Sequence, residues 1–284
     1  MAPDTVARAE RVLGREATTW ARVESRGYSL NEHWTVGFAD GTRAFLKQAG
    51  VDPSPEWLRD EQHVYACVSG PFMPEFLGFE DGDRPLLILE DMLPGARWPP
   101  PWHPGDVELV LAALQEAAAA PVGGDLPRLA DGDWAGWPEI AGDPEPFLGT
   151  GVASASWLER SLPVLLEAAE RAPLEGDSLV HCDVRSDNLC LRDDRAVLLD
   201  WNHARVGNSA FDVAFWLPSL ALEHGPPPDD FGVDDFAAVV AGFFAVRAGL
   251  PPPAGAPLVR GFQREQLEVA LPWACRVLDL PLES

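Results

Sequence analysis

The octapeptide His-Cys-Asp-Val-Arg-Ser-Asp-Asn occupies residues 181–188, and Leu-Leu-Asp-Trp follows it at residues 198–201. Between these polar sites, two short apolar runs at residues 188–191 and 196–199 flank the polar turn 192–195. Two such runs around a tight polar turn are typical of a β-hairpin. The sequence therefore predicts a hairpin that brings the two polar stretches together.

The turn chemistry also predicts the register of this hairpin. With Asp193 and Asp194 as the turn, residue 188 faces residue 199, and Asn188 and Asp200 emerge side by side at its open end. Mg²⁺ prefers oxygen ligands and usually takes only one or two from the protein, so an amide oxygen and a carboxylate suit it. The register alone leaves open which way each side chain points, because a slip of one residue reverses the faces.

The same stretch contains Asp183, a carboxylate that can accept a proton, and the nearby cation Arg185. Together with the amide and carboxylate of the hairpin, these are the components of a phosphoryl-transfer site in the order found in kinases. Two other interpretations stay open from the octapeptide alone. His181 and Asp183 could be a metal pair of a hydrolase, aided by His203, and Asp187-Asn188 could be ordinary turn chemistry.

Lys47 is the only lysine among the 21 lysine and arginine residues. Its ammonium is a compact point charge that the planar guanidinium of arginine does not imitate, which favours a chemical role. It ends the second strand of a predicted hairpin, 33–38 and 42–47, around the turn 39–41. The alternative is that compositional drift left one lysine here by chance.

A partner for Lys47 is predicted on the helix that Ser54-Pro55-Glu56 opens. Glu61 falls within the apolar stripe of this helix, whose other members are Trp57, Val64, Tyr65 and Val68. A buried carboxylate is costly without a cation, so we expect a Lys47–Glu61 pair that directs the ammonium toward nucleotide phosphates. Alternatively, Glu61 lies at the edge of the stripe with its carboxylate in water.

In this order and spacing, the residues resemble those of the aminoglycoside phosphotransferase and choline kinase-like family, small-molecule kinases with the protein-kinase fold. The resemblance covers most of the chain and rests on Lys47, Glu61, the apolar run 86–92, His181-x-Asp183, Asn188, Asp200 and the segment 207–214. It implies a bilobal α+β fold. A small N-terminal lobe, residues 1–92, would hold an antiparallel sheet and a helix, and a larger, mainly helical lobe, residues 93–284, would follow a hinge at about 86–93.

The resemblance also implies roles for these residues. Asp183 would be the catalytic base or orient the acceptor hydroxyl, and Arg185 would face the γ-phosphate, unless it only pairs with an acidic neighbour such as Asp187. Asn188 and Asp200 would bind Mg²⁺. The cofactor-binding residues would be Lys47 at the α- and β-phosphates, its partner Glu61, Glu90 and Met92 at the hinge, and Ser29. The expected cofactors are ATP, with GTP left open, and Mg²⁺.

The chain departs from the family pattern at three places. Cys182 stands where the family commonly has glycine, Asn202 stands where it usually has an acid, and the loop 26–32 has a single glycine. Ser29 in that loop is the expected phosphate contact, and an ordinary polar turn is the alternative. Asp212 is expected to be structural, in a capping arrangement with Ser209, and by resemblance it would support the catalytic loop from below.

The composition indicates which kinds of binding partner and which location to expect. A net charge of −24 argues against nucleic acid and anionic membranes, and no apolar run approaches the ~18 residues that span a bilayer. No secretory signal is visible and the four cysteines lack metal-type spacing, so we expect free thiols and a cytoplasmic protein. The acidic segment 223–235 favours a cationic acceptor, although it could equally be a solvated loop. Trp134, Trp137 and Trp216 could wall an acceptor pocket or belong to the core.

The sequence thus predicts an ATP- and Mg²⁺-dependent phosphotransferase that acts on a hydroxyl of a small molecule, with a cationic antibiotic such as an aminoglycoside as the favoured acceptor. One alternative is a kinase of a sugar, amino alcohol or other metabolite. A second is a nucleotide-binding regulatory protein without catalysis. The oligomeric state is left open between monomer and homodimer.

Overall fold

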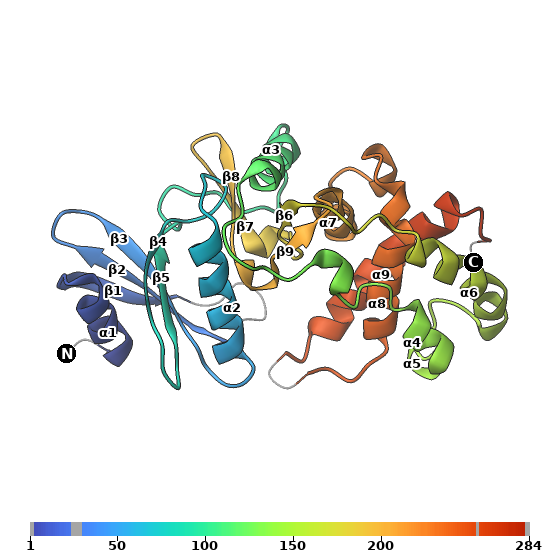
Figure 1. The fold of residues 1–284 in the computed structure, drawn as a ribbon, viewed down its shortest axis with the longest axis horizontal. Helices are drawn as coiled ribbons and strands as arrows, with labels where there is room; N and C mark the ends of the chain where they lie inside the picture. The colour runs from blue at the N-terminus through green and yellow to red at the C-terminus, as the bar shows by residue number, and fades with distance from the viewer. Residues whose placement is uncertain (1–2, 24–29, 254–255, 282–284) are drawn as a thin grey trace. The chain divides into compact units, whose positions relative to one another are not determined.

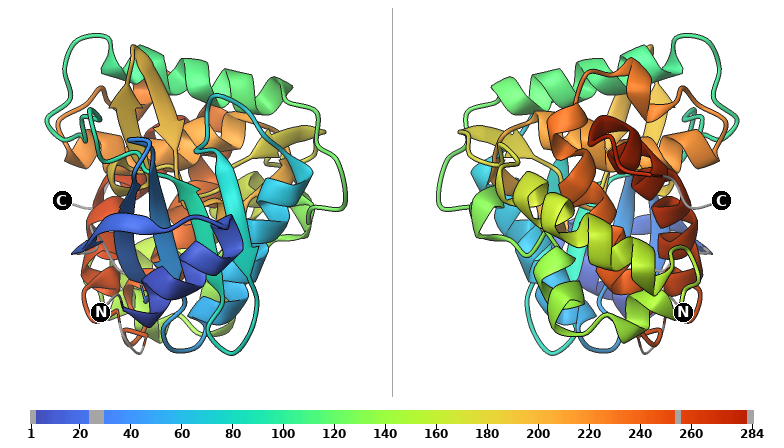
Figure 2. Two further views of the ribbon diagram at one scale, coloured as in Figure 1. Left: turned by 90° about the vertical axis from the view of Figure 1, so that its left-hand side faces the viewer. Right: turned by 90° about the vertical axis from the view of Figure 1, so that its right-hand side faces the viewer.

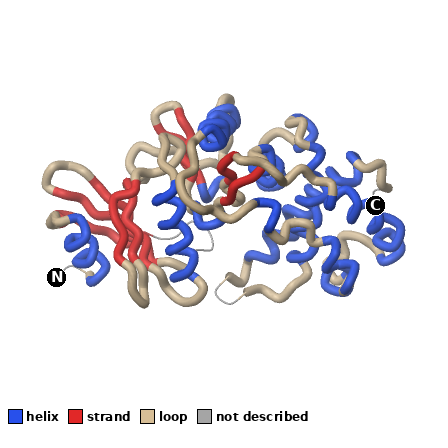
Figure 3. The backbone as a smooth tube through the Cα atoms, in the orientation of Figure 1, coloured by secondary structure: helices blue, strands red, loops and turns tan. Residues whose placement is uncertain are grey.

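The computed structural model describes residues 3–23, 30–253 and 256–281, and it divides into two compact units. Unit 1 comprises Met1–Pro99, His103–Leu126 and Ser186–Arg205, and unit 2 comprises Pro100–Trp102, Pro127–Arg185 and Val206–Ser284. The functional lobes expected from the sequence, 1–92 and 93–284, remain a prediction. Most of the strands belong to unit 1 and most of the helices to unit 2 (Figure 3).

Unit 1 contains the main sheet and the metal-site hairpin predicted from the sequence (Figure 1). Its elements are α1 (Asp4–Leu13), β1 (Ala17–Val23), β2 (Glu32–Phe38), β3 (Arg43–Gln48), α2 (Ser54–Cys67), β4 (Phe76–Glu80), β5 (Leu86–Glu90), α3 (Asp106–Ala119), η2 (Ser186–Asn188), β7 (Leu189–Arg192), β8 (Arg195–Leu198) and η3 (Trp201–His203). The first five strands form one antiparallel sheet in the order β1-β2-β3-β5-β4.

The alternation of side chains along β3 separates the core of this sheet from the candidate site. Ala44 and Leu46 are fully buried in a cluster with Val6 and Ala9 of α1. Successive residues of a strand point to opposite faces, so Lys47 projects from the other face, where α2 lies (Figures 1 and 2). One strand therefore provides both a core contact and a functional side chain.

Helix α2 differs from the sequence prediction in two details. Ser54 is not its N-cap, because the cap is Pro53 and the Ser54 hydroxyl accepts a hydrogen bond from the Gly50 N–H at 2.8 Å. Trp57, expected in the apolar stripe, is 38% exposed. The stripe is instead completed by Leu58, and Glu61 lies within it as predicted.

The β7–β8 hairpin has the predicted register. Leu189 pairs with Leu198 and Arg192 with Arg195, which leaves Asp193 and Asp194 as the turn. Both turn residues have a positive φ, as a tight two-residue hairpin turn requires. The Leu199 N–H donates to the Asn188 carbonyl at 2.8 Å, so residue 188 faces residue 199.

Unit 2 is built around a helical core. Its elements are η1 (Leu129–Asp131), α4 (Trp137–Gly142), α5 (Glu145–Leu148), α6 (Ala155–Glu170), β6 (Ser178–Val180), β9 (Arg205–Gly207), α7 (Ala210–Leu222), η4 (Pro228–Asp230), η5 (Asp234–Phe236), α8 (Ala237–Ala248) and α9 (Val259–Val277). The connection 121–151, expected to be irregular, contains η1, α4 and α5. Trp134, Trp137 and Trp216 are buried among the core residues, as the second of the two sequence interpretations had it.

Two further observations concern the described part of the chain. None of its helices combines the length and apolar character that crossing a bilayer needs. The four cysteines all lie within it, all are buried, and no disulfide joins them.

Candidate functional site

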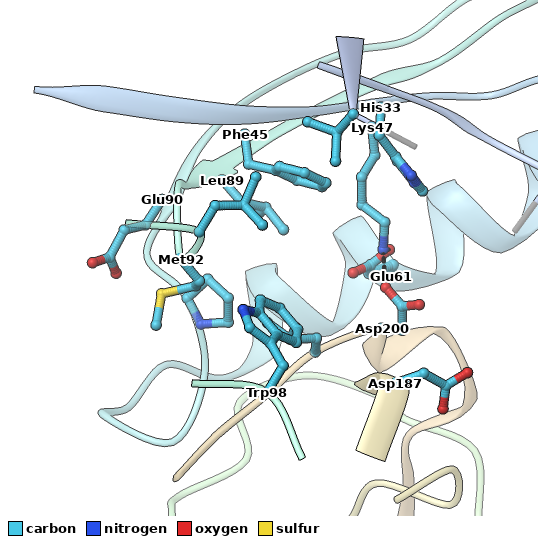
Figure 4. Close-up of a pocket in the computed structure, with 14 residues that line it drawn as sticks. His33, Phe45, Lys47, Glu61, Leu89, Glu90, Met92, Trp98, Asp187 and Asp200 are labelled. Atoms are coloured by element: carbon cyan, nitrogen blue, oxygen red, sulfur yellow. Dashed lines mark hydrogen bonds and ion pairs between the residues drawn. The ribbon is translucent and has the colours of Figure 1, made fainter. Parts of the chain in front are cut away.

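The side chains of Lys47, Glu61 and Asp200 meet in unit 1 (Figure 4). Lys47 is 5% exposed, and its ammonium donates to Oε2 of Glu61 at 2.6 Å and also to Oδ1 of Asp200. The pair between Lys47 and Glu61 is the one predicted from the sequence. Asp200 is a second partner that sequence reasoning did not anticipate.

The two carboxylates decide the charge of the lysine. Burial by itself lowers the pKa of Lys47, but Asp200 and then Glu61 more than offset this, so its pKa is raised and the ammonium stays protonated. Burial raises the pKa of Glu61, against the opposing effect of Lys47. His33 pairs with Lys47 across β2 and β3, and burial, followed by the Lys47 charge, lowers its pKa to about 4. The neighbouring imidazole is therefore neutral at pH 7.

Asn188 and Asp200 lie at the same end of the β7–β8 hairpin. Asn188 ends η2 and is buried, whereas the Asp200 side chain is 42% exposed. Asp200 has a φ of 61°, a left-handed conformation that aspartate tolerates better than most residues. The backbone at Asp200 is therefore strained, and strained backbone positions cluster at functional sites.

The donor atoms of this pair fit Mg²⁺, because an amide oxygen and a carboxylate oxygen are the hard ligands that it takes from proteins. Within the described ranges, no group of three or more His, Cys, Asp or Glu side chains is placed to hold a metal ion. The fit to a metal therefore rests on Asn188 and Asp200 together with phosphate and water oxygens.

A cavity in unit 1 is lined by the side chains that meet at Lys47, and Asn188 is not among its lining residues. Its lining includes five of the predicted site residues, namely Lys47, Glu61, Glu90, Met92 and Asp200. The predicted phosphate contact Ser29 lies outside the described residues. The rest of the lining is Val23, His33, Phe45, Pro74, Leu89, Leu93, Trp98, Asp187 and Leu199. Sequence reasoning did not predict that these residues line the cavity, because nothing in their local sequence distinguishes them from ordinary core and turn residues.

The catalytic loop predicted at Asp183 and Arg185 belongs to unit 2. The Arg185 Nε lies 3.3 Å from Oδ1 of Asp183, and the guanidinium lies 5.8 Å from the centre of the Phe262 ring. The predicted base is thus one partner of Arg185, for which the sequence had offered pairing with an acidic neighbour such as Asp187 as the alternative to a role at the γ-phosphate. A guanidinium in this place orients the carboxylate and adds positive charge beside it.

Asp212 holds the same loop from within unit 2. Its carboxylate accepts hydrogen bonds from the backbone N–H groups of His181 and Cys182, both at 2.7 Å. The Ser209 side chain makes no capping bond, so the predicted capping arrangement is wrong, whereas the predicted support of the loop is present. Burial raises the pKa of Asp212 to about 7, opposed by these two hydrogen bonds and reinforced by Asp183.

The backbone conformation at Cys182 gives a physical reason why glycine suits this position. Its φ is 65°, in the left-handed region that glycine adopts without strain. The side chain is buried, and its thiol donates weakly to the Val180 carbonyl at 3.8 Å. The loop thus keeps a glycine-like backbone with a cysteine in it.

Several carboxylates of the acidic segment 223–235 are engaged within unit 2. Asp229 forms an ion pair with Arg276 at 2.7 Å, Asp234 accepts from the Trp273 indole at 3.0 Å, and Glu223 accepts from Trp102 at 2.9 Å. These contacts reduce the number of carboxylates available to grip a cationic ligand.

The sequence pattern of the phosphotransferase enzyme family matches residues 30–255, and the chain belongs to that family. It is therefore a phosphotransferase. No curated relative matches the chain.

Solved structures with the same fold span most of the chain. A Plasmodium vivax ethanolamine kinase has a TM-score of 0.58 at 12% identity, over 90% of this chain and 81% of that one. A spectinomycin phosphotransferase solved with ADP and spectinomycin has a TM-score of 0.56 at 10% identity, over 94% and 97%. A candidate fructosamine-3-kinase from Thermobifida fusca has a TM-score of 0.53 at 21% identity, over 96% and 100%. The predicted α+β fold of small-molecule kinases is confirmed.

Proposed function

We propose that this phosphotransferase moves the γ-phosphoryl group of ATP to a hydroxyl of a small molecule and requires Mg²⁺. The observation that carries the proposal is the buried Lys47 ammonium, held between Glu61 and Asp200 in a cavity of unit 1. A fixed cation next to carboxylate and amide oxygens is the arrangement that binds a triphosphate and its metal.

The residues of unit 1 bind the donor. Lys47 contacts the α- and β-phosphates, and Glu61 keeps its ammonium in place. Asn188 and Asp200 hold Mg²⁺, which when bound neutralises charge on the phosphates. Glu90 and Met92 line the cavity away from this charged group and contact the rest of the nucleotide.

The residues of unit 2 act on the acceptor. Asp183 orients the acceptor hydroxyl and accepts its proton during attack on the phosphoryl group. Arg185, which contacts Asp183, stabilises charge on the transferred group. Asp212 positions the loop through its two backbone hydrogen bonds without touching the substrate. Catalysis then comes mainly from positioning and charge neutralisation.

For the acceptor we propose a cationic antibiotic such as an aminoglycoside as the first class to test. The support is the net charge of −24, which favours cationic ligands. A sugar or an amino alcohol is the second candidate, because the acidic segment is partly engaged by Arg276, Trp273 and Trp102. The names of the similar structures include an ethanolamine kinase and a spectinomycin phosphotransferase, which supports testing both classes.

The test measures ADP release with aminoglycosides, macrolides, peptide antibiotics, sugars and amino alcohols. We expect turnover with at least one class, and we expect Asp183→Ala to lower kcat by about 10²- to 10⁴-fold while nucleotide binding is retained. Asp143→Ala, on the exposed surface of unit 2, is the matched control and should behave as wild type.

Two outcomes would contradict the proposal. Near-normal turnover by Asp183→Ala would show that another group accepts the proton. Mg²⁺-dependent ATP binding without turnover on any acceptor would favour a regulatory nucleotide-binding protein.

A further inference from the structure

Lys47 contacts two carboxylates in unit 1, and the proposed function gives one of them to a metal. Its ammonium donates to Glu61 at 2.6 Å and to Oδ1 of Asp200, and Figure 4 shows the end of the lysine side chain next to both groups. The proposed function has Asp200 hold Mg²⁺ together with Asn188. The same carboxylate therefore serves two cations, the lysine seen in the structure and the metal of the proposed reaction.

The two partners of Lys47 differ in how firmly they hold it. The Glu61 side chain lies within the buried stripe of α2 and is 2% exposed, so losing its cation would leave a buried charge uncompensated. The Asp200 side chain is 42% exposed, and water solvates it when its partner changes. Of the two contacts, the one with Asp200 is thus the one that is open to exchange for another cation.

A divalent cation at Asp200 would meet the charge of Lys47. The ammonium contacts the carboxylate that the metal needs, and two cations on one carboxylate repel each other, most strongly where water is partly excluded. The other metal ligand, Asn188, is a neutral amide that adds no negative charge to offset this repulsion. A triphosphate changes the balance, because its oxygens carry several negative charges that attract the ammonium and the metal together.

We propose that Lys47 blocks the metal site of the donor-free enzyme by holding Asp200, so that a divalent cation binds tightly only together with a triphosphate. The inference rests on the proposed function, since it concerns the metal and the donor of that reaction. Because coupling between two ligands is reciprocal, the triphosphate raises the affinity for the metal by the same factor as the metal raises the affinity for the triphosphate. The lysine that binds the donor therefore also couples metal entry to donor entry.

The test measures Mn²⁺ binding to the enzyme without nucleotide, from the paramagnetic resonance signal of free Mn²⁺. Mn²⁺ takes the same kind of oxygen ligands as Mg²⁺. We expect Lys47→Met to bind Mn²⁺ about tenfold more tightly than the wild type, the gain that corresponds to losing one competing charged hydrogen bond at a partly exposed carboxylate. A variant that has lost its donor-binding cation should thus gain affinity for the metal.

A second variant excludes a trivial source of this gain. Lys47→Met alone leaves Glu61 without its cation, and that carboxylate then becomes a new potential ligand for Mn²⁺. The double variant Lys47→Met with Glu61→Leu removes both charges, and it should show the same gain. Adding Asp200→Asn to the double variant should abolish the gain, because the metal then lacks the carboxylate that Lys47 had held.

Arg59→Met is the matched control for net charge. It removes one positive charge from α2, where Arg59 pairs with Asp81 at 2.9 Å, and Arg59 does not line the cavity. Because the chain carries a net charge of −24, losing any cation makes the protein as a whole more attractive to a metal ion. Arg59→Met should leave the Mn²⁺ affinity unchanged, and a gain equal to that of Lys47→Met would overturn the inference.

The outcomes separate this inference from the proposed function. Calorimetry of ATP binding with and without Mg²⁺ tests the function, which fails if ATP binding is absent or independent of Mg²⁺. If ATP binding depends on Mg²⁺ but neither lysine variant binds Mn²⁺ more tightly than the wild type, only the inference fails. It also fails if the gain appears in Lys47→Met alone, or if it persists with Asp200→Asn, which would place the metal on another acid of the cavity such as Asp187. Should Lys47→Met not fold, the double variant, which retains no lone buried carboxylate at position 61, decides the matter.

Discussion

Removal of the Lys47 ammonium, in the variant Lys47→Met, should destabilise the fold because it leaves a buried carboxylate without its cation. The Lys47 and Glu61 side chains are 6% and 2% exposed and their charged atoms are 2.6 Å apart. At an effective dielectric constant of about 20, two unit charges at that distance attract by roughly 6 kcal/mol. Desolvation offsets part of this attraction, and breaking one partner of such a pair costs about 3–5 kcal/mol. We expect Lys47→Met to lower the free energy of unfolding by that amount at pH 7.

The double variant Lys47→Met with Glu61→Leu should recover most of that loss. An apolar pair of similar volume carries no desolvation penalty, so replacing a buried ion pair completely is often neutral or stabilising. Asp200 also loses its lysine, but its side chain is 42% exposed and water screens it. Phosphoryl transfer should be lost in both variants, because neither retains the cation for the phosphates.

Urea unfolding at several pH values measures these differences. Burial raises the pKa of the Glu61 carboxyl against the opposing effect of Lys47, so loss of the lysine in Lys47→Met raises that pKa further. The contribution of a carboxyl with a raised pKa favours folding at low pH and is lost as the pH rises through the folded-state pKa. The defect of Lys47→Met should therefore shrink as the pH falls toward the ordinary carboxyl range. The reasoning is refuted if Lys47→Met is as stable as the wild type at pH 7, or if the double variant is as unstable as the single one.

Two further predictions concern the catalytic loop. Asp212→Asn replaces a carboxylate oxygen with an amide that cannot accept from both backbone N–H groups, so urea unfolding should show a loss of about 1–3 kcal/mol. Because the pKa of Asp212 in the folded state, about 7, lies above its ordinary value of 3.8, the wild type should lose stability as the pH rises from about 4 to about 7, and a variant with the same slope would show that Asp212 does not titrate there. Cys182→Val should lower the thermal unfolding midpoint, since a φ of 65° costs an L-residue about 1–2 kcal/mol and a β-branched side chain tolerates it least, and Cys182→Gly should stay within about 1 kcal/mol of the wild type. Equal midpoints for Val and Gly would show that the loop backbone is not strained.

Local chemistry made several features predictable. The register of β7 with β8 follows from the turn at Asp193 and Asp194, because a two-residue loop fixes which residues face each other. The Lys47–Glu61 pair was predictable because a carboxylate inside an apolar stripe needs a cation, and the chain has one lysine. The family resemblance, which rests on short motifs, agrees with the family match over residues 30–255.

Other features depend on contacts between distant segments. Asp200 reaches Lys47 across 153 positions of sequence, and Asp212 reaches Cys182 across 30, where the local pattern had indicated a helix cap. The Asp212 carboxylate thus had a possible local use and a tertiary one, and packing selected the tertiary one. Ser54 also looked like an N-cap, yet its hydroxyl accepts from the Gly50 N–H four residues earlier, so here one local contact replaced another.

By itself, the sequence predicted which groups would carry the chemistry, since periodicity, turn residues and the single lysine are properties of neighbouring positions along the chain. Only the tertiary structure decided what surrounds them. Trp98 and Phe45 line one cavity because the segment at Arg97 pairs with Leu191 while β3 lies in the main sheet. Side-chain burial and the direction of approach between such segments depend on the packing of the whole unit, which no local pattern encodes.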